Sequence, residues 1–246
     1  MTLALTDGIS TAPHIIGFSS ISLFKAWLDT NPIASDLPIP ESIPREGFIK
    51  VVCNATTSTA LTASGEVYTW THDARYPQCL GRRPETPEHA SLPHPIAYLS
   101  ETKIIDIASG GYMSAALSKD GELFLWGQSC PGIAQTLDIL ERKNCNDDDQ
   151  DDFVKCLELK IEGREARVKY VAVGSGHVIV AAEALGKNGV LRAVFAAGQG
   201  GSGQLGLGGT PEFIERFVEV EALRGEKLKG LHAAGWSTWV IVGKGT

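Results

Sequence analysis

Short apolar runs separated by glycine-containing turns occur along most of this chain and predict β-strands. In residues 105–127 (IDIASGGYMSAALSKDGELFLWG), an apolar run leads through two glycines into a strand of small residues, SAALS. The turn Lys119-Asp120-Gly121 separates that strand from a third one, ELFLWG. An Asp-Gly pair between two apolar runs is a strong hairpin signal, because a type I′ turn requires positive φ angles. The pattern therefore predicts three consecutive antiparallel strands.

The same unit is found four times in the chain. Residues 49–70 align with residues 105–126, and this alignment places Trp70 on Trp126. Residues 168–183 and 228–242 repeat the first two strands of the unit. Repetition of one structural unit along a chain identifies a repeat architecture. Short strands that end in an aromatic residue or a glycine are typical of propeller blades, so we predict an all-β fold.

The order of motifs resembles the repeat of the regulator of chromosome condensation (RCC1) family. Residues 120–127 match the element Asp-Gly-Glu-apolar-x-x-Trp-Gly, and residues 203–208 match Gly-Gln-Leu-Gly-x-Gly residue by residue. Residues 78–81 (QCLG) are a degenerate version of the Gly-Gln-Leu-Gly element. The resemblance covers about residues 48–242 and implies a β-propeller of RCC1-type repeats with about four recognisable blades.

The chain departs from the family pattern in three ways. The histidine of the Gly-Gly-x-His turn is kept only at His177, and Ala197-Gly198 stands where the family has Trp-Gly. The best-known members close a ring of seven blades, whereas this chain shows four repeats. These departures leave the closure of the ring open.

We predict a single propeller domain over residues 1–246, with repeats at about 48–102, 103–167, 168–227 and 228–246. The last repeat supplies two strands, and an open sheet edge promotes aggregation. We therefore expect residues 12–28 to complete it, so that the N- and C-terminal strands share the closing blade. An acidic insertion, residues 144–152, separates the second repeat from the third.

Charge and cysteine content narrow the class of protein. The net charge of −7 argues against a broad phosphate-binding surface, so we expect no nucleic-acid partner. No apolar stretch approaches the ~18 residues of a membrane span, so we expect no membrane partner. The five cysteines are widely spaced without a Cys-x-x-Cys pair and indicate reduced thiols. We expect a cytoplasmic or nuclear location, or both.

The glycine-rich segment, which could suggest a phosphate-binding site, is explained by the turns of the repeats. Gly198, Gly200 and Gly203 form a Gly-x-Gly-x-x-Gly pattern, but a pyrophosphate site needs a helix directly after it. The following segment, with Gly208-Gly209-Thr210-Pro211, cannot be a helix. The six histidines lack metal-ligand spacing, and no nucleophile motif is present. We predict no catalytic residue, no cofactor, no metal and no enzymatic activity.

The candidate partner-binding residues are acidic or aromatic. The acidic insertion contains Asp147, Asp148, Asp149, Asp151 and Asp152. Such a run is typical of a solvated insertion, and the alternatives are contact with a basic partner or a weak cation site. Of Trp236 and Trp239, we expect one in the core and the other exposed, and we select Trp236 as the partner anchor. The basic segments Arg82-Arg83 and 164–169 favour solvated loops over nucleic-acid contacts.

These observations favour a non-enzymatic protein-binding scaffold or regulatory subunit that acts through propeller rim loops. The alternative is a guanine-nucleotide exchange factor for a small GTPase, the activity of the family's founding member. Residues 235–242 (GWSTWVIV) are also similar to the end of the fungal killer-toxin-insensitivity propellers, or α-tubulin suppressors. That resemblance implies a small zinc protein as partner and a role in diphthamide synthesis and tRNA wobble-uridine modification.

Overall fold

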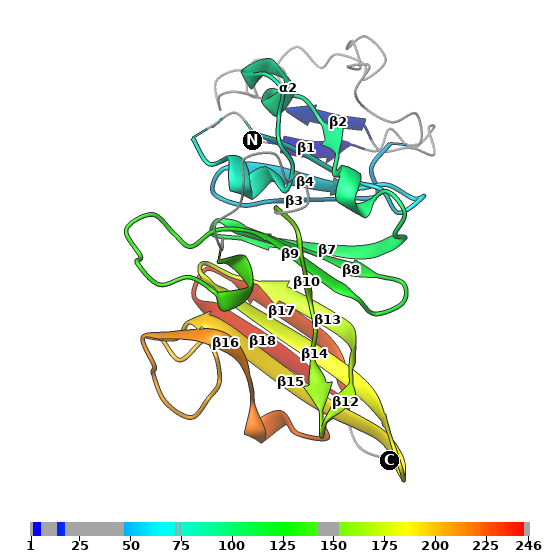
Figure 1. Ribbon diagram of the computed structural model, residues 1–246, viewed down its shortest axis with the longest axis vertical. Helices are drawn as coiled ribbons and strands as arrows, with labels where there is room; N and C mark the ends of the chain where they lie inside the picture. Colours follow the sequence, from blue (N-terminus) through cyan, green and yellow to red (C-terminus); the bar gives the residue numbers. More distant parts are fainter. Residues whose placement is uncertain are drawn as a thin grey trace.

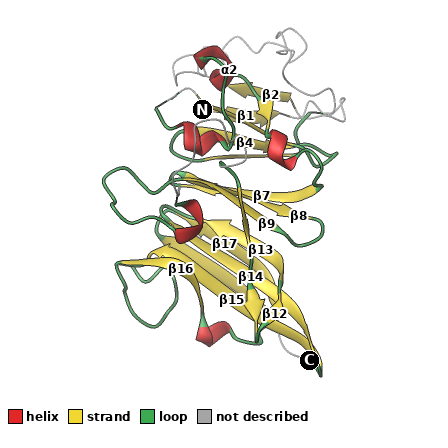
Figure 2. Ribbon diagram, in the orientation of Figure 1, coloured by secondary structure: helices red, strands yellow, loops and turns green. Residues whose placement is uncertain are grey.

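The computed structural model of the protein describes residues 2–5, 14–17, 47–71, 73, 75–141 and 153–243. Strands make up most of this part of the chain (Figure 2). The helices among the described residues are short: η2 (Pro77–Leu80), α2 (Pro87–Ser91), η3 (Ala97–Leu99), η4 (Asp138–Leu140) and η6 (Glu221–Leu223). None of the described helices has the length and apolar character that crossing a membrane requires.

Three four-stranded antiparallel sheets follow one another in chain order (Figure 1). The first contains β3 (Lys50–Cys53), β4 (Thr57–Leu61), β5 (Val67–Thr71) and β6 (His94–Pro95). The second contains β7 (Ile104–Gly110), β8 (Met113–Ser118), β9 (Leu123–Gly127) and β10 (Lys155–Leu157). The third contains β13 (Arg167–Val173), β14 (His177–Gly186), β15 (Gly189–Gln199) and β16 (Phe213–Glu219). The all-β prediction is therefore confirmed.

Three two-stranded sheets complete the described structure. The last sheet of the chain consists of β17 (Leu228–Ala234) and β18 (Ser237–Val242). The other two pair β1 (Thr2–Leu5) with β2 (His14–Gly17), and β11 (Lys160–Ile161) with β12 (Arg164–Glu165).

The described N-terminal strands do not complete the last sheet, which corrects the expectation of a closing blade shared by the two termini. β2 pairs with β1 along its whole length and with no strand of the last sheet. Figure 1 places this pair at one end of the molecule, near β3 and β4, whereas β17 and β18 lie in the other half. The rest of the predicted closing segment, residues 18–28, lies outside the described residues.

Glycines at the hairpin turns allow successive sheets to approach one another. Gly65 and Gly121 have φ angles of +100° and +86°, as their hairpins require. The Gly65 carbonyl accepts a hydrogen bond from the Ile104 amide at 3.1 Å, and the Gly121 carbonyl accepts one from the Val168 amide at 2.8 Å. Each turn is thereby tied to the first strand of the next sheet.

The central strand of each sheet contributes to two cores, because alternate side chains point to opposite faces. In β8, Ala115 and Leu117 pack toward the third sheet, whereas Ala116 packs toward the first. In β14, Val178 and Val180 pack toward the second sheet. The residues of β14 that pack toward the last sheet are Ile179 and Ala181. The second and third sheets therefore each share a core with the sheet before and the sheet after them.

Candidate protein-binding site

Trp236, the predicted partner anchor, lies in the turn between β17 and β18 and is 65% exposed. Trp239 of β18 is exposed as well, so the expectation that one of the two tryptophans lies in the core is wrong. The five aspartates of the acidic insertion, Asp147, Asp148, Asp149, Asp151 and Asp152, lie outside the described residues. Their role in binding a partner stays a prediction.

A group of exposed apolar side chains occupies β18 and the turn before it. Its members, which we call the terminal apolar surface, are Trp236, Trp239 and Ile241, and the last two are 54% and 51% exposed. Exposed apolar side chains gathered at one place on a protein mark interaction sites more often than single scattered ones do. Tryptophan is also enriched among the residues that dominate protein–protein binding energy.

The internal repeat explains why these side chains are exposed. Trp239 and Ile241 occupy the positions that Ala115 and Leu117 occupy in the second sheet. There the third sheet covers them, and Ala115 and Leu117 are 0% and 3% exposed. The last sheet is not followed by a further described sheet, so the same face of β18 meets solvent.

The outer edge of β18 is also open. In the second sheet the middle strand β8 pairs with β7 on one side and with β9 on the other. Among the described strands, β18 pairs with β17 alone. Its outward-facing backbone amides and carbonyls therefore form the edge of a two-stranded sheet, to which another strand can be added.

Two contacts between the third sheet and the last one fix the position of this edge. The Nε2 atom of His177 lies 3.0 Å from the Thr238 hydroxyl oxygen, and the Ser175 amide donates to the Gly235 carbonyl at 2.7 Å. A side chain at Gly174 would place its Cβ 2.1 Å from the His177 ring, so glycine is required beside this imidazole. Burial lowers the pKa of His177, which favours the neutral imidazole.

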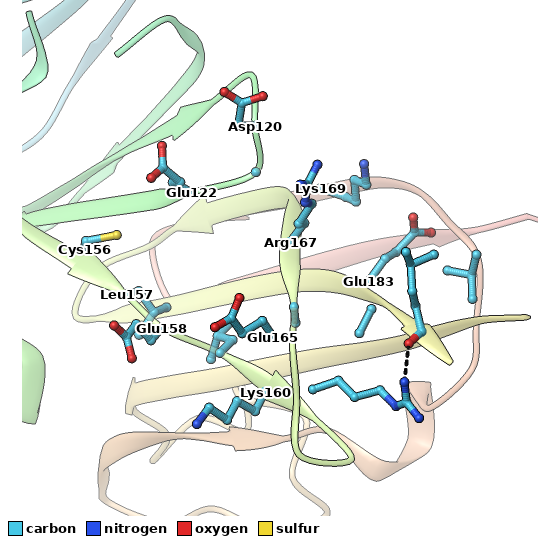
Figure 3. Close-up of a pocket in the computed structure, with 17 residues that line it drawn as sticks. Asp120, Glu122, Cys156, Leu157, Glu158, Lys160, Glu165, Arg167, Lys169 and Glu183 are labelled. Carbon is cyan, nitrogen blue, oxygen red and sulfur yellow. Dashed lines mark hydrogen bonds between the residues drawn. The ribbon is translucent and has the colours of Figure 1, made fainter. Parts of the chain in front are cut away.

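A groove of about 720 Å³ lies between the second and third sheets (Figure 3). Its basic residues come from β11, β12 and β13, so residues 164–169 are mostly strand and not the expected solvated loop. Acidic side chains lie among the basic ones. The charged residues that line the groove are Asp120, Glu122, Glu158, Lys160, Arg164, Glu165, Arg167, Lys169 and Glu183. Charges of both signs give no surplus of cations, which a phosphate backbone would need.

Arg82 is a structural residue rather than part of a solvated basic loop, which corrects the sequence-based expectation. Its Nη2 donates to the Thr69 carbonyl at 2.9 Å and to the His89 carbonyl at 3.1 Å. Burial lowers its pKa to about 10. The neighbouring Arg83 is exposed, as expected.

Three of the described thiols, those of Cys79, Cys130 and Cys156, are poor nucleophiles. Burial raises the pKa of Cys79 to about 11, and it also raises the pKa of Cys130 and Cys156. The thiolate is the reactive form of cysteine, so a raised pKa suppresses its chemistry. No three His, Cys, Asp or Glu side chains converge as metal ligands within the described part of the chain.

The glycine-rich segment after β15 is a packed turn. It leads into β16 without an intervening helix, so it lacks the helix N-terminus of a dinucleotide site. The Gln204 side-chain oxygen accepts a hydrogen bond from the Ser202 amide at 2.9 Å, and Leu205 is buried in the core shared with the last sheet.

Known proteins resemble this chain over its repeats. Human HERC3, a probable E3 ubiquitin-protein ligase, is 30% identical over 167 residues, which are 68% of this chain and 14% of HERC3. The mitochondrial RCC1 domain-containing protein RUG3 of Arabidopsis thaliana is 34% identical over 38% of this chain and 20% of its own length. The chain thus spans a minor part of these curated relatives. No protein-family model matches it.

A solved structure has a similar arrangement of strands. The crystal structure of Prp20p, the RCC1 of Saccharomyces cerevisiae, superposes with a TM-score of 0.51 and 20% identity over 76% of this chain and 42% of Prp20p. At this identity the likeness concerns the fold. Taken with the repeats, the four-stranded sheets and the sequence relatives, it shows that the chain belongs to the family of RCC1-repeat propeller proteins.

Proposed function

We propose that the protein is a non-enzymatic scaffold or regulatory subunit that binds another protein through the terminal apolar surface. The observation that carries this proposal is the exposure of Trp236, Trp239 and Ile241 on one short hairpin. The His177–Thr238 contact holds that hairpin against the third sheet, so the surface is preorganised. RCC1-type propeller domains are typically protein-binding, and Prp20p is described as binding Gsp1p and histones.

Purification of the tagged full chain from its native host, followed by mass spectrometry, tests this function. We expect one stoichiometric partner whose complex re-forms from the purified proteins. Trp236→Ser is expected to weaken that complex at least about tenfold, as loss of a central aromatic anchor does. Leu185→Ser is the matched control, because Leu185 is an exposed apolar residue at the tip of the β14–β15 hairpin. Equal loss of binding in both variants would contradict the proposal.

The same purification tests the narrower role implied by residues 235–242. A small zinc protein as the stoichiometric partner would support a role in diphthamide synthesis and tRNA wobble-uridine modification. Its absence from a purification that retains another partner would remove this narrower role and leave the scaffold function in place.

Guanine-nucleotide exchange is the alternative function. It is tested by the release of a fluorescent guanine nucleotide from a small GTPase at substoichiometric amounts of the protein. We expect the release rate to equal the spontaneous one. Acceleration by the full chain, together with tight binding of the nucleotide-free GTPase, would replace the scaffold function with exchange.

A further inference from the structure

We propose that the open edge of β18 binds an extended strand of a partner polypeptide, and that an aromatic side chain of this strand fills a cavity beside Gly206. This inference rests on the proposed protein-binding function and names the chemistry of the partner segment. The mode is strand addition, in which the backbone provides affinity and alternate side chains provide specificity.

The cavity lies between β18 and the glycine-rich segment that carries the family's Gly-Gln-Leu-Gly element. Its volume is about 390 Å³, and its lining includes Gly206, Val220, Leu223 and Thr238. A Cβ added at Gly206 would meet no atom nearer than the Cγ1 of Val220, at 3.5 Å. The space next to Gly206 is therefore open.

The corresponding position in the first sheet is filled by Trp126 of β9, the third strand of the second sheet. Gly81 corresponds to Gly206 in the repeat, and their φ angles are +65° and +67°. A Cβ at Gly81 would lie 2.9 Å from the Cδ1 of Trp126, which is itself 0% exposed. The indole of Trp126 thus closes the site that stays open beside Gly206.

The walls of the two sites are equivalent. Ile96 and Leu99 pack with Trp126 in the core between the first and second sheets. In the repeat they correspond to Val220 and Leu223, which line the open cavity. The backbone is alike as well: the Ile96 amide donates to Val67 at 2.9 Å, and the Val220 amide donates to Val194 at 2.7 Å. The wall residues are therefore in place around the open cavity. Leu223 is half-buried there, whereas Leu99 in the filled site is fully buried.

A comparison with the third sheet links the aromatic residue to the glycine-rich element. Ala197 of β15 stands at the position of Trp126. The repeat before it has no Gly-Gln-Leu-Gly element in residues 128–152. Trp126 thus follows a copy of the element and Ala197 does not, whereas Trp70 of the first sheet has no copy before it in residues 1–48. The last sheet follows the most complete copy of the element.

The β8–β9 pair defines the direction and spacing of the incoming strand. In that pair Trp126 lies opposite Ser114 and Phe124 lies opposite Ala116, in antiparallel register. Transferred to β18, the register places an aromatic side chain opposite Thr238 and a second large apolar side chain opposite Val240. Both would face the third sheet, because side chains two positions apart share a face.

The strand must also carry glycine directly after the aromatic residue. In β9 this residue is Gly127, whose φ is +115°. A Cβ there would lie 2.2 Å from the carbonyl oxygen of Tyr112, which corresponds to Trp236 in the repeat. The predicted ligand pattern is therefore apolar-x-aromatic-Gly, as in Phe124 to Gly127.

None of the described strands that could correspond to the third strand of a repeat fits the open edge of β18. β5, β9 and β15 each have a paired strand on both sides in their own sheets. β2, which pairs with β1 alone, has Ile16 where the pattern requires an aromatic residue before the glycine. We therefore assign the added strand to a separate polypeptide that carries this pattern.

Binding of a synthetic peptide to the full chain tests the inference. The probe is a fluorescein-labelled peptide with the sequence of residues 121–127, GELFLWG, flanked by lysines for solubility, and binding is measured by fluorescence anisotropy. We expect saturable binding that weakens at least about tenfold with Trp126→Ala or Gly127→Ala in the peptide, because these changes empty the cavity or obstruct the turn.

Methylation of alternate backbone nitrogens in the peptide separates strand addition from plain apolar adhesion. Only alternate amides of an antiparallel strand point toward its neighbour. We expect methylation of one alternate set to abolish binding and methylation of the other set to preserve it. Equal binding of both methylated peptides, or no binding of the unmodified peptide, would overturn the proposal.

A variant of the protein tests the position of the cavity. Leu223→Trp is expected to fill the cavity from its wall and to reduce peptide affinity at least about tenfold. Leu185→Trp adds the same side chain at an exposed hairpin tip and is expected to leave the affinity unchanged. Urea unfolding of both variants verifies that they fold. Undiminished binding by a folded Leu223→Trp variant would contradict the assigned cavity.

Two further outcomes would contradict the assignment of a partner strand to the β18 edge. A concentration-dependent dimer of the full chain that the peptide dissociates would identify a second copy as the source of the strand and overturn the assignment to a foreign partner. A stoichiometric partner that Trp236→Ser weakens, in the absence of peptide binding, would remove strand addition while leaving the proposed function in place.

Discussion

The Nε2 atom of His177 lies 3.0 Å from the hydroxyl oxygen of Thr238, 61 positions further along the chain. This contact joins β14 of the third sheet to β18 of the last one. His177 is fully buried, and burial lowers its pKa from the ordinary value of 6.5. Burial disfavours the charged imidazolium, so the stability of the folded protein depends on a neutral His177.

This dependence predicts that stability falls on acidification. The unfolded imidazole takes up a proton near pH 6.5, whereas the folded one does so only at lower pH. Between these two pH values the unfolded state binds more protons, so the free energy of unfolding decreases as the pH decreases. Urea unfolding between about pH 7.5 and 5 should show a shallower pH dependence in His177→Gln than in the wild type.

His94→Gln provides the comparison for that measurement. Burial also lowers the pKa of His94, although His94 is less buried than His177. We expect its replacement to remove a smaller part of the pH dependence. An unchanged slope in His177→Gln would mean that the folded and unfolded states bind this proton equally well.

Gly81 and Gly206 form a matched pair for a test of packing against Trp126. Alanine at either position adopts a left-handed backbone conformation, at a cost of about 1–2 kcal/mol. Only at Gly81 does the new Cβ also clash with the indole of Trp126, and this should cost a further 1–3 kcal/mol, roughly. Urea unfolding of Gly81→Ala and Gly206→Ala measures the difference. Equal destabilisation would show that the indole moves aside freely.

Trp126 and Trp239 should differ in their contributions to stability. Trp126 is fully buried between the first two sheets, and Trp126→Ala is expected to cost about 3–5 kcal/mol. Trp239 is exposed, and Trp239→Ala should change the free energy of unfolding by less than about 0.5 kcal/mol. Chemical denaturation checks both values. A large loss from Trp239→Ala would mean that this side chain is covered in the isolated protein.

Arg82 should be sensitive to a conservative substitution. Its guanidinium donates from Nε to the Thr69 hydroxyl at 3.2 Å and from Nη2 to backbone carbonyls. A lysine at this position reaches fewer of these acceptors, so Arg82→Lys is expected to cost about 1–3 kcal/mol. Arg83→Lys, at the exposed neighbour, is the control and should be close to neutral. A neutral Arg82→Lys would show that water replaces the lost donors.

The repeat pattern predicted the strands because local sequence and the final sheets agree. The Asp120-Gly121 pair lies in the β8–β9 turn as predicted, and Gly121 has a positive φ angle. Asp120 does not have one, so the expected type I′ turn is wrong although the hairpin is confirmed. The apolar residues on both faces of β8 likewise correspond to a strand with neighbours on both sides. Short-range turn chemistry and alternation were enough for these elements.

The hairpin of the third sheet differs from what its local sequence suggests. Residues 184–188 suggest a long loop, but β14 and β15 continue to Gly186 and Gly189, which pair with each other. The turn therefore contains only Lys187 and Asn188, and the strands are longer than those of the other sheets. Glycine, lysine and asparagine near a strand end indicate a loop locally, whereas the ladder of cross-strand bonds extends the sheet beyond them.

The binding surface could be predicted only in part. The exposed turn position of Trp236 follows from its place beside Gly235 between two apolar runs. The exposure of Trp239 does not, because an alternating strand gives no information on whether another sheet covers its second face. The contact between His177 and Thr238 was missed for a similar reason, since it joins two sheets rather than two neighbouring strands.

The sharing of cores between successive sheets has a consequence for the dynamics of the molecule. Each internal sheet packs against a neighbouring sheet on both faces, whereas β17 and β18 pack against a sheet on one face only. Stability in such an array is a sum of nearest-neighbour terms, so opening proceeds from the end that lacks a neighbour. Amide hydrogen exchange should accordingly be faster in β17 and β18 than in β8 and β14. Binding of a strand at the β18 edge should then slow amide exchange most in the β17–β18 hairpin and progressively less in each sheet further from it.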